Sequence, residues 1–331
     1  MKALISTRPG PPEDLQLSDM PDPVAGEGEV VIAVKAAGVN FPDVLIIEDK
    51  YQFKPERPFA PGGEVAGVIE SVGPGVTNVK VGQRVIGSLG WGGYAEKVKA
   101  PAVRAMPIPD NMPFDEASAF ILTYGTSYYA LKDRGVVQPG ETVLILGAAG
   151  GVGVAAIELA KAMGARVVGA VSSQEKAEFA KACGADATVI YPASAFAKEQ
   201  SRALADQFKQ ATNGGADVVY DAVGGDYCEP ALRAMNWNGR YLVVGFPAGI
   251  PAPPLNLTLL KSTSIVGVFW GASTAREPDL HKGNVRDLFK LYAEGKIKPR
   301  ISARYKLADG GKAIRALSDR TATGKLVVVM E

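Results

Sequence analysis

Four glycines between residues 147 and 153 are the residues of this sequence whose type and spacing most clearly indicate chemistry. They occur in the segment ETVLILGAAGGVG. Because glycine has no side chain, the backbone of such a turn can approach a phosphate group closely. A helix that begins in the turn adds free N–H groups and a partial positive charge. The spacing therefore predicts a cradle for the pyrophosphate of a dinucleotide, formed by Gly147, Gly150, Gly151, Val152 and Gly153.

The residues on either side of this turn supply the elements that a cradle requires. Residues 143–146 are a short apolar run between two glycine-containing turns, which is typical of a buried parallel strand. Residues 154–163 are rich in alanine and predict a helix. A tight strand-to-helix turn without a ligand is the alternative interpretation. The presence of both flanking elements favours the binding site.

The end of the second strand, predicted at residues 166–171, decides between the two common dinucleotides. An acidic side chain at its tip would bond the ribose 2′-hydroxyl of NADH and repel a 2′-phosphate. The chain instead places Ser172 and Ser173 there, with Lys176 one helical turn later. These groups predict NADPH as the cofactor. The alternative is that the serines only cap a helix and that Lys176 is a solvated surface lysine.

Strands and helices alternate along the middle of the chain, as is typical of α/β proteins. Strands are predicted at residues 143–146, 166–171, 188–191, 217–222, 240–245 and 264–269, and helices at 174–183, 194–211 and 285–294. This alternation predicts a doubly wound parallel sheet. The first 120 residues predict turn-rich β structure, with strands at 29–36, 65–72 and 84–87 and helices following at 114–123 and 126–134. Strands at 304–307 and 326–330 are expected to return to this first domain, because the parallel sheet is already complete.

The composition excludes several classes of function. The chain has 36 Lys and Arg against 35 Asp and Glu, a balance that gives no electrostatic footprint for nucleic acid. No run of 18 apolar residues predicts a membrane helix, and the N-terminus lacks the apolar core of a signal peptide. Cys183 and Cys228 are far apart and predict reduced thiols in a cytoplasmic protein.

The scarcity of histidine limits the chemistry further. His281 is the only histidine in the sequence, and with two scattered cysteines a catalytic zinc site or a His-based triad is hard to build. We therefore expect no metal. The chemistry must come mainly from the cofactor, with the protein supplying orientation and hydrogen bonds.

Three motifs carry a resemblance to a known family. They are AGVNFPDVLIIEDKYQFKPERPFAPGGEVAGVIESVG at residues 37–73, LTYGTSYYAL at 122–131 and the GAAGGVG turn. Over nearly all of the chain they resemble the zinc-free medium-chain dehydrogenase/reductase superfamily, and within it the quinone oxidoreductase family. The resemblance implies a Rossmann domain at residues 125–265, inserted into a GroES-like β-rich catalytic domain that is formed by residues 1–124 and 266–331.

The same resemblance bears on zinc. The zinc-dependent alcohol dehydrogenases of the superfamily carry a Cys in a GV-C-xx-D segment and a His in a G-H-E segment. By this resemblance those positions correspond to Asn40 and Gly63 here, and the cysteine-rich lobe is missing. Both ligands are thus replaced, in agreement with the independent count of His and Cys.

The resemblance also implies roles for individual residues. It places Asn40, Asp43 and Tyr51 on the substrate side of the cleft, and Tyr124, Gly125 and Thr126 near the nicotinamide. It implies 2′-phosphate contacts for Lys176, Tyr191 and Arg320, and walls of the site for Phe246, Phe269 and Trp270. Packing offers an alternative for each: Asn40 could cap a helix that starts at Pro42, and Tyr51, Phe269 and Trp270 could be core or interface aromatics.

These inferences predict an NADPH-dependent oxidoreductase that transfers a hydride to a quinone or to an α,β-unsaturated carbonyl compound without zinc. Asn40 and Tyr51 are the expected hydrogen-bond donors to the developing oxyanion. The final proton is expected from Tyr51 or from water, because no tuned histidine is available.

Other interpretations stay open. A 2-enoyl-CoA thioester reductase would need basic side chains for the CoA phosphates, and the candidates are Lys54, Arg57, Lys261, Arg276 and Lys282. A non-catalytic NADPH-binding protein, crystallin-like or RNA-binding, is the alternative of another class, although the neutral net charge argues against RNA. The apolar run at 265–270 predicts either an edge strand that pairs with its copy in a homodimer or a buried sixth strand.

Overall fold

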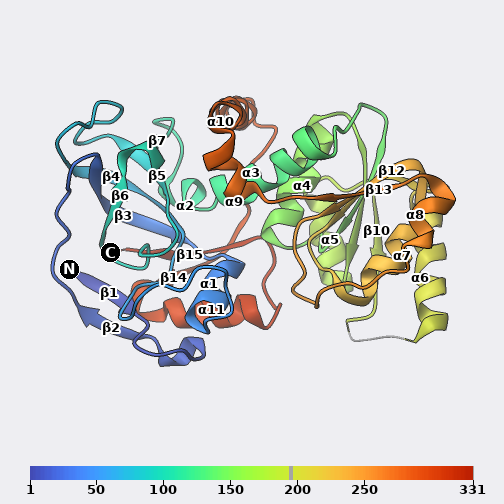
Figure 1. Ribbon diagram of the computed structural model, residues 1–331, viewed down its shortest axis with the longest axis horizontal. Coiled ribbons are helices and arrows are strands. Elements are labelled where there is room, and N and C mark those ends of the chain that lie inside the picture. The colour runs from blue at the N-terminus through green and yellow to red at the C-terminus, as the bar shows by residue number, and fades with distance from the viewer. Residues whose placement is uncertain (194–196, 331) are drawn as a thin grey trace. The chain divides into compact units, whose positions relative to one another are not determined.

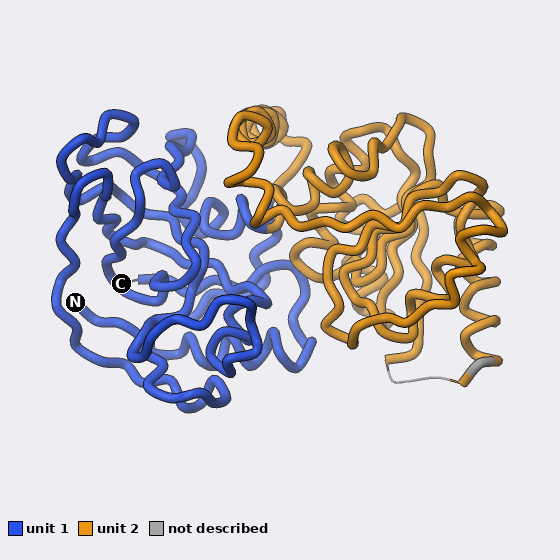
Figure 2. Tube along the Cα trace, in the orientation of Figure 1, with its two compact units in different colours: residues 1–122, 299–331 blue, residues 123–298 orange. Residues whose placement is uncertain are grey.

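The computed structural model describes residues 1–193 and 197–330, which form two compact units. The chain crosses from the first unit into the second after Leu122 and returns after Lys298. The first unit therefore contains both ends of the chain (Figure 2).

The second unit is built on a sheet that has six strands among the described residues, and every neighbouring pair is parallel. In order across the sheet they are β10 (Ala187–Ile190), β9 (Arg166–Val171), β8 (Thr142–Leu146), β11 (Ala216–Asp221), β12 (Met235–Val243) and β13 (Ser264–Gly267). The chain starts in the middle, runs to one edge and then crosses to the other, which is the order of a Rossmann fold. The predicted fold class is confirmed.

Helices cover both faces of this sheet. Figure 1 draws α4 and α5 on one side of it and α6 and α7 on the other. The helical segments of this unit are α3 (Ile121–Tyr128), the π-helical η3 (Tyr129–Arg134), α4 (Gly151–Ala162), α5 (Gln174–Ala182), α6 (Lys198–Ala211), η4 (Gly225–Tyr227), α7 (Cys228–Arg233), α8 (Asn256–Lys261), α9 (Trp270–Arg276) and α10 (Pro278–Ala293). Within the described part of the chain, none of the helices is long and apolar enough to span a membrane.

The first unit is mostly β structure. Its main sheet runs in the order β14 (Ile301–Lys306), β15 (Lys325–Val329), β3 (Glu29–Gly38), β4 (Glu64–Val72), β5 (Arg84–Ser88) and β7 (Ala105–Pro107), and β6 (Lys97–Pro101) pairs with β3. A separate ribbon joins β1 (Lys2–Ile5) to β2 (Gln16–Asp19). Because β15 pairs with β3, the last strands return to the first unit as predicted.

Short helices complete this unit. They are η1 (Pro12–Asp14), α1 (Phe41–Ile47), η2 (Ala102–Arg104), α2 (Phe114–Ala117), η5 (Leu307–Asp309) and α11 (Gly310–Ser318). The unit has its own core, in which Val30 and Ile32 of β3 pack with Val65 of β4 and Val328 of β15. A separate core lies under the parallel sheet of the second unit.

Some boundaries differ from the prediction. The predicted Rossmann domain ended at residue 265, whereas the second unit continues through α9 and α10 to Lys298. Contacts within the unit explain the difference, since Lys132 of η3 donates a 2.8 Å hydrogen bond to Asn284 of α10. The strand predicted at 264–269 ends at Gly267, and Trp270 already belongs to a helix.

The helices also differ in detail. The single helix predicted over 114–123 is divided into α2 and α3. The helix predicted over 194–211 corresponds to α6, and its predicted start at 194–196 lies outside the described residues. Helices α1 and α11 had no predicted element of their own, although a capped helix was the alternative interpretation at Asn40.

Candidate functional site

The glycine turn follows β8, the strand at which the order of the parallel sheet changes direction. Gly147 adopts a φ of +73°, a left-handed conformation that glycine takes without strain. A Cβ on Gly153 would lie 2.2 Å from the carbonyl oxygen of Gly147. These two glycines are therefore required by the turn itself and by the packing of α4 against it.

Gly150 has no such structural reason. It is the exposed N-cap residue of α4, and a Cβ there would have the Gly147 carbonyl oxygen, 3.5 Å away, as its nearest neighbour. The protein thus has room for a side chain at position 150. A phosphate group bound at the N-terminus of α4 would occupy that room, and Gly151 and Val152 begin the helix whose N–H groups would meet it.

Residues that directly follow parallel strands lie at the carboxyl end of the sheet. Four other predicted cofactor contacts follow strands of this sheet and therefore lie at that end. They are Ser172 after β9, Tyr191 after β10, Phe246 after β12 and Phe269 after β13. Phe246 and Phe269 are 50% and 57% exposed. Tyr191 is buried, with its ring centroid 4.5 Å from that of Tyr227.

The segment after β9 contains the N-cap that was the alternative interpretation, and it also brings an ammonium next to a hydroxyl. Ser173 is the N-cap of α5, and its Oγ accepts a 3.3 Å hydrogen bond from the backbone N–H of Lys176. The Nζ of Lys176 donates a 3.3 Å hydrogen bond to the Oγ of Ser172. Capping and phosphate binding are compatible here, because Lys176 and Ser172 stand next to each other at the tip of the strand.

Trp270 packs against α3. A Cβ on Gly125 would lie 2.8 Å from Cζ2 of Trp270, so the indole rests on the backbone of that glycine. The indole is also edge-on to His281 of α10, with 5.8 Å between ring centroids. Trp270 thus has the packing role that was the alternative interpretation. Thr126, the next residue of α3, is half-buried.

Tyr124 lies on the same helix and is buried. Its hydroxyl donates to the carboxylate of Glu158 on α4. The sequence analysis gave no role to Glu158. An acidic residue within an alanine-rich helix was the signal that could have identified it as a buried hydrogen-bond acceptor. The hydroxyl of Tyr124 is therefore engaged inside the second unit.

Asp43 lies in the first unit and caps α1. Its carboxylate accepts hydrogen bonds from the backbone N–H of Asn40 (2.8 Å), the backbone N–H of Gly62 (3.1 Å) and the hydroxyl of Tyr94 (3.3 Å). Burial nevertheless raises the pKa of Asp43 to about 6. In this structure the carboxylate ties the N-terminus of α1 to the segment before β4.

Asn40 is the N-cap of α1 and is also buried. Its Oδ1 accepts a 2.6 Å hydrogen bond from Nζ of Lys325 on β15. Its Nδ2 donates to Oε2 of Glu64 (3.3 Å) and to the carbonyl oxygen of Gly38 (3.4 Å). Sequence analysis did not single out Lys325 or Glu64 for a role. The available signal was a lysine at the start of the apolar strand KLVVV.

Tyr51 differs from Asn40 and Asp43 in its surroundings. Its ring is half-buried, packs against the core of the first unit and lies edge-on to Phe53. Burial, helped by the nearby charge of Asp43, raises the pKa of its hydroxyl. Within residues 1–193 and 197–330 that hydroxyl has no hydrogen-bond partner, so it is free to donate to a ligand.

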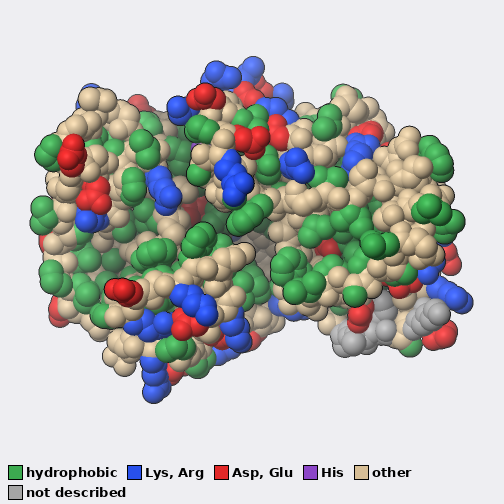
Figure 3. All heavy atoms as spheres, viewed as in Figure 1, with side chains coloured by type: hydrophobic (Ala, Val, Ile, Leu, Met, Phe, Trp, Pro, Cys, Tyr) green, Lys and Arg blue, Asp and Glu red, His purple; other side chains and the backbone are tan. Residues whose placement is uncertain are grey.

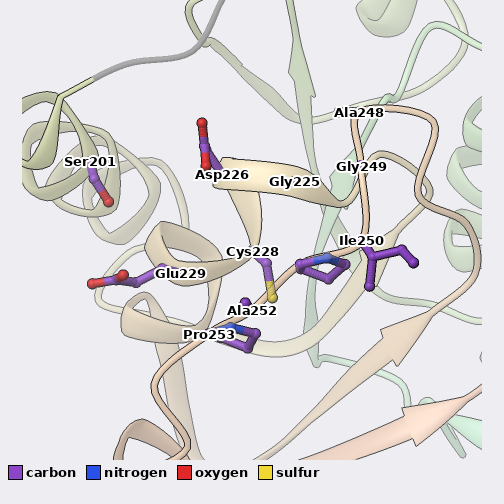
Figure 4. A pocket seen from close by; sticks show the side chains of 11 residues that line it. Ser201, Gly225, Asp226, Cys228, Glu229, Ala248, Gly249, Ile250, Ala252 and Pro253 are labelled. Atoms are coloured by element: carbon purple, nitrogen blue, oxygen red, sulfur yellow. The ribbon is translucent and has the colours of Figure 1, made fainter.

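Two features are still to be placed: Arg320, which is the remaining predicted residue, and a cavity of the second unit. Arg320 follows α11 in the first unit, with a φ of +56°. A cavity of about 430 Å³ opens in the second unit between Ser201, Cys228 and the loop at 248–253 (Figure 4). None of the predicted site residues lines it. Burial raises the pKa of the Cys228 thiol to about 11, which keeps it unreactive.

Comparison with known proteins adds to this geometry. Residues 26–110 match the family described as alcohol dehydrogenase GroES-like domain, and residues 151–283 match the family described as zinc-binding dehydrogenase. The quinone oxidoreductase-like protein 2 homolog of Nematostella vectensis is 40% identical over 308 residues, which cover 92% of this chain and 82% of that protein.

Two further matches span nearly the whole chain. The quinone oxidoreductase of Mus musculus is 32% identical, with coverage of 100% of this chain and 98% of that protein. The crystal structure of Escherichia coli quinone oxidoreductase complexed with NADPH superposes with a TM-score of 0.90 at 29% identity and covers 99% of this chain and 100% of that one.

Proposed function

Since this chain belongs to the quinone oxidoreductase family of the medium-chain dehydrogenase/reductase superfamily and is an NADPH-dependent oxidoreductase, we propose that it reduces quinones or α,β-unsaturated carbonyl compounds without zinc. Bound NADPH supplies a hydride, and a proton from the protein or from water completes the reduction. For a quinone, NADPH, the quinone and a proton yield NADP⁺ and the hydroquinone.

The second unit supports the cofactor side of this proposal. The exposed Gly150 leaves the N-terminus of α4 open for the pyrophosphate. Ser172 and Lys176 offer a hydroxyl and an ammonium for the 2′-phosphate, and Tyr191, Phe246 and Phe269 follow strands at the same edge. We propose these residues as the contacts that orient NADPH, with Arg320 of the first unit as a further candidate for the 2′-phosphate.

The first unit supports the substrate side. The free, half-buried hydroxyl of Tyr51 is our candidate for the donor that neutralises the developing oxyanion, and it can deliver the final proton. Asn40 is the second candidate donor, because the two hydrogen bonds that its side-chain NH₂ group donates are long, at 3.3 and 3.4 Å. Asp43 supports both by fixing α1.

The pair Asn40–Lys325 is the single observation that carries the zinc-free part of the proposal. Asn40 and Gly63 occupy the positions that resemble those of the two zinc ligands, and neither is a ligand of the Cys or His type. The ammonium of Lys325, 2.6 Å from Oδ1 of Asn40, adds a positive charge that opposes a divalent cation. The residues present therefore do not fit a catalytic zinc ion.

A substrate panel tests this proposal. We expect the purified protein to oxidise NADPH in the presence of a quinone or a short enone, as measured by the loss of absorbance at the nicotinamide band. We expect it to retain this activity after dialysis against a zinc chelator. Faster turnover of crotonyl-CoA than of either electrophile would establish the 2-enoyl-CoA reductase instead. Binding of NADPH with no turnover of any of the three would establish the non-catalytic alternative.

The apolar edge of the second unit supports a homodimer. Strand β13 lies at the edge of the parallel sheet, and the neighbouring α8 exposes Leu259 and Leu260. Figure 3 shows hydrophobic side chains gathered over the region where Figure 1 draws these two elements. We propose that β13 pairs with its copy in a second subunit, because an unpaired edge with an apolar flank favours association.

Sedimentation velocity tests the dimer. We expect a mass of twice 34.6 kDa at micromolar concentration, and dissociation when Ile265→Lys places a charge on β13. A monomeric wild-type protein would overturn this part. The cytoplasm is our proposed compartment, because Cys183 and Cys228 are both free and buried.

A further inference from the structure

Lys325 is a buried cation of the first unit whose role the proposed reaction leaves open. Its side chain is 6% exposed. The Nζ donates to the carbonyl oxygen of Val39 (2.9 Å) and to Oδ1 of Asn40 (2.6 Å), and it lies 4.0 Å from Oε2 of Glu64. Taking an ammonium out of water is unfavourable, so these partners must compensate for its lost hydration.

The two ends of the Asn40 amide face groups of opposite charge. Lys325 stands at the oxygen end, and the carboxylate of Glu64 stands at the nitrogen end. Rotation of the amide by 180° would place its NH₂ group against an ammonium and its oxygen against a carboxylate. Only one of the two orientations is therefore compatible with the surrounding charges.

The backbone around this cluster holds its members in register. The N–H of Val39 donates to the carbonyl of Leu326, and the N–H of Lys325 donates to the carbonyl of Arg300. Glu64 is held in turn by the N–H of Leu122, which donates to its Oε1 at 2.9 Å. Lys325 thus approaches Asn40 from a fixed strand, and Glu64 is fixed on the other side.

We infer that Lys325 is a positioning residue that fixes the orientation of the Asn40 amide, so that a substrate that displaces one of its two long hydrogen bonds, to Glu64 or to Gly38, meets an N–H and not the amide oxygen. This inference rests on the proposed role of Asn40 at the substrate. An N–H edge binds the oxygen of a quinone or an unsaturated carbonyl, whereas an amide oxygen would bind an alcohol hydroxyl. Lys325 therefore selects for substrates that accept a hydride over those that donate one.

Two variants separate positioning from stability. Lys325→Met leaves Glu64 buried without its cation, so it is expected to destabilise the unit. The double variant Lys325→Met/Glu64→Gln removes both charges and relieves that cost. A glutamine at position 64 can donate or accept, so it no longer dictates the orientation of Asn40.

The decisive comparison is between the two variants. We expect the double variant to recover the melting temperature lost by Lys325→Met, while its kcat for a quinone stays about 10-fold to 100-fold below wild type with an unchanged KM for NADPH. Recovery of kcat together with stability would overturn the inference, because Lys325 would then act only through stability. If neither variant folds, Lys325→Arg replaces them: kcat within about fivefold of wild type supports the inference, and a greater loss at unchanged stability overturns it.

A second measurement does not depend on turnover. In wild-type protein the side-chain NH₂ of Asn40 should exchange slowly with solvent in NMR spectra, and in the double variant it should exchange faster. Slow exchange in both proteins would contradict the inference. A wild-type protein that reduces no electrophile would instead end the proposed function, and the exchange measurement would still decide how Lys325 acts on Asn40.

Discussion

The hydroxyl of Tyr124 donates a 2.7 Å hydrogen bond to Oε2 of Glu158, and the backbone N–H of Lys298 donates to the same oxygen at 2.8 Å. Tyr124 follows the point at which the chain enters the second unit, and Lys298 is the last residue before the chain leaves it. One buried carboxylate of α4 therefore holds both ends of this unit.

We expect Tyr124→Phe to reduce the free energy of unfolding by about 1–2 kcal/mol, because Glu158 loses one of its donors while buried. NADPH affinity should stay unchanged, since the cradle is intact. Urea unfolding and fluorescence titration would measure the two. Tyr129→Phe is the matched control, because Tyr129 is half-buried and its hydroxyl has no hydrogen bond in the described part of the chain. Equal effects of both variants would contradict the role of Glu158.

Lys176 should determine the preference for NADPH. Lys176→Glu is expected to weaken NADPH binding by about 10-fold to 100-fold, because charge-assisted hydrogen bonds contribute about 1.5–3 kcal/mol. Binding of NADH, which lacks the 2′-phosphate, should change little. Calorimetric titration of both dinucleotides would test this. Lys181→Glu makes the same charge change at the exposed far end of α5 and serves as the control. An equal loss for both dinucleotides would refute the 2′-phosphate assignment.

Gly150 and Gly153 should respond differently to a side chain. Gly150→Val is expected to abolish measurable NADPH binding at a cost of only about 1 kcal/mol in the free energy of unfolding, because only the ligand needs the space. Gly153→Ala should instead destabilise the unit by about 3 kcal/mol or more, since its Cβ would lie 2.2 Å from a carbonyl oxygen. Retained NADPH affinity in Gly150→Val would remove the cradle.

Asp43 should make the stability of the protein depend on pH. Burial raises the pKa of this carboxyl from its ordinary value of 3.8 to about 6 in the folded unit, so the folded state binds the proton more tightly. Stability contributed by the protonated carboxyl is complete below pH 4 and is lost as the pH rises through 6, by up to about 3 kcal/mol. Asparagine does not titrate, so we expect the unfolding free energy of the wild type to fall relative to that of Asp43→Asn between pH 4 and pH 7. A wild type that instead gains stability relative to Asp43→Asn as the pH rises would show that the hydrogen bonds to the carboxylate outweigh its burial.

Gly125 should be intolerant of a methyl group. In Gly125→Ala the new Cβ would meet the Trp270 ring at 2.8 Å, so the indole must move. We expect a loss of about 1–3 kcal/mol in unfolding free energy and a shift of tryptophan emission. Gly283→Ala on α10 is the control, because nothing lies within 4 Å of a Cβ there. An unshifted emission spectrum in Gly125→Ala would show that Trp270 does not rest on this glycine.

Local sequence was sufficient to predict the strands of the parallel sheet in the second unit. Apolar runs at 143–146 and 166–171 identified β8 and β9 almost to the residue, because strands buried on both faces need continuous apolar sequence. The glycines after β8 identified the turn and the helix start, because these conformations depend on neighbouring residues. The sequence therefore determined the parallel sheet, the position of the glycine turn and the choice of NADPH, whereas the cradle stays a prediction.

Only the tertiary structure decided the partners of the buried polar groups. Asn40 and Lys325 are 285 residues apart, and Glu158 and Lys298 are 140 residues apart. No periodicity in the sequence predicts such pairs. The strand sequence KLVVV is the same whether its first lysine faces solvent or contacts a buried amide. A buried charge is stable only beside a compensating group, and that group is brought to it by the pairing of distant strands.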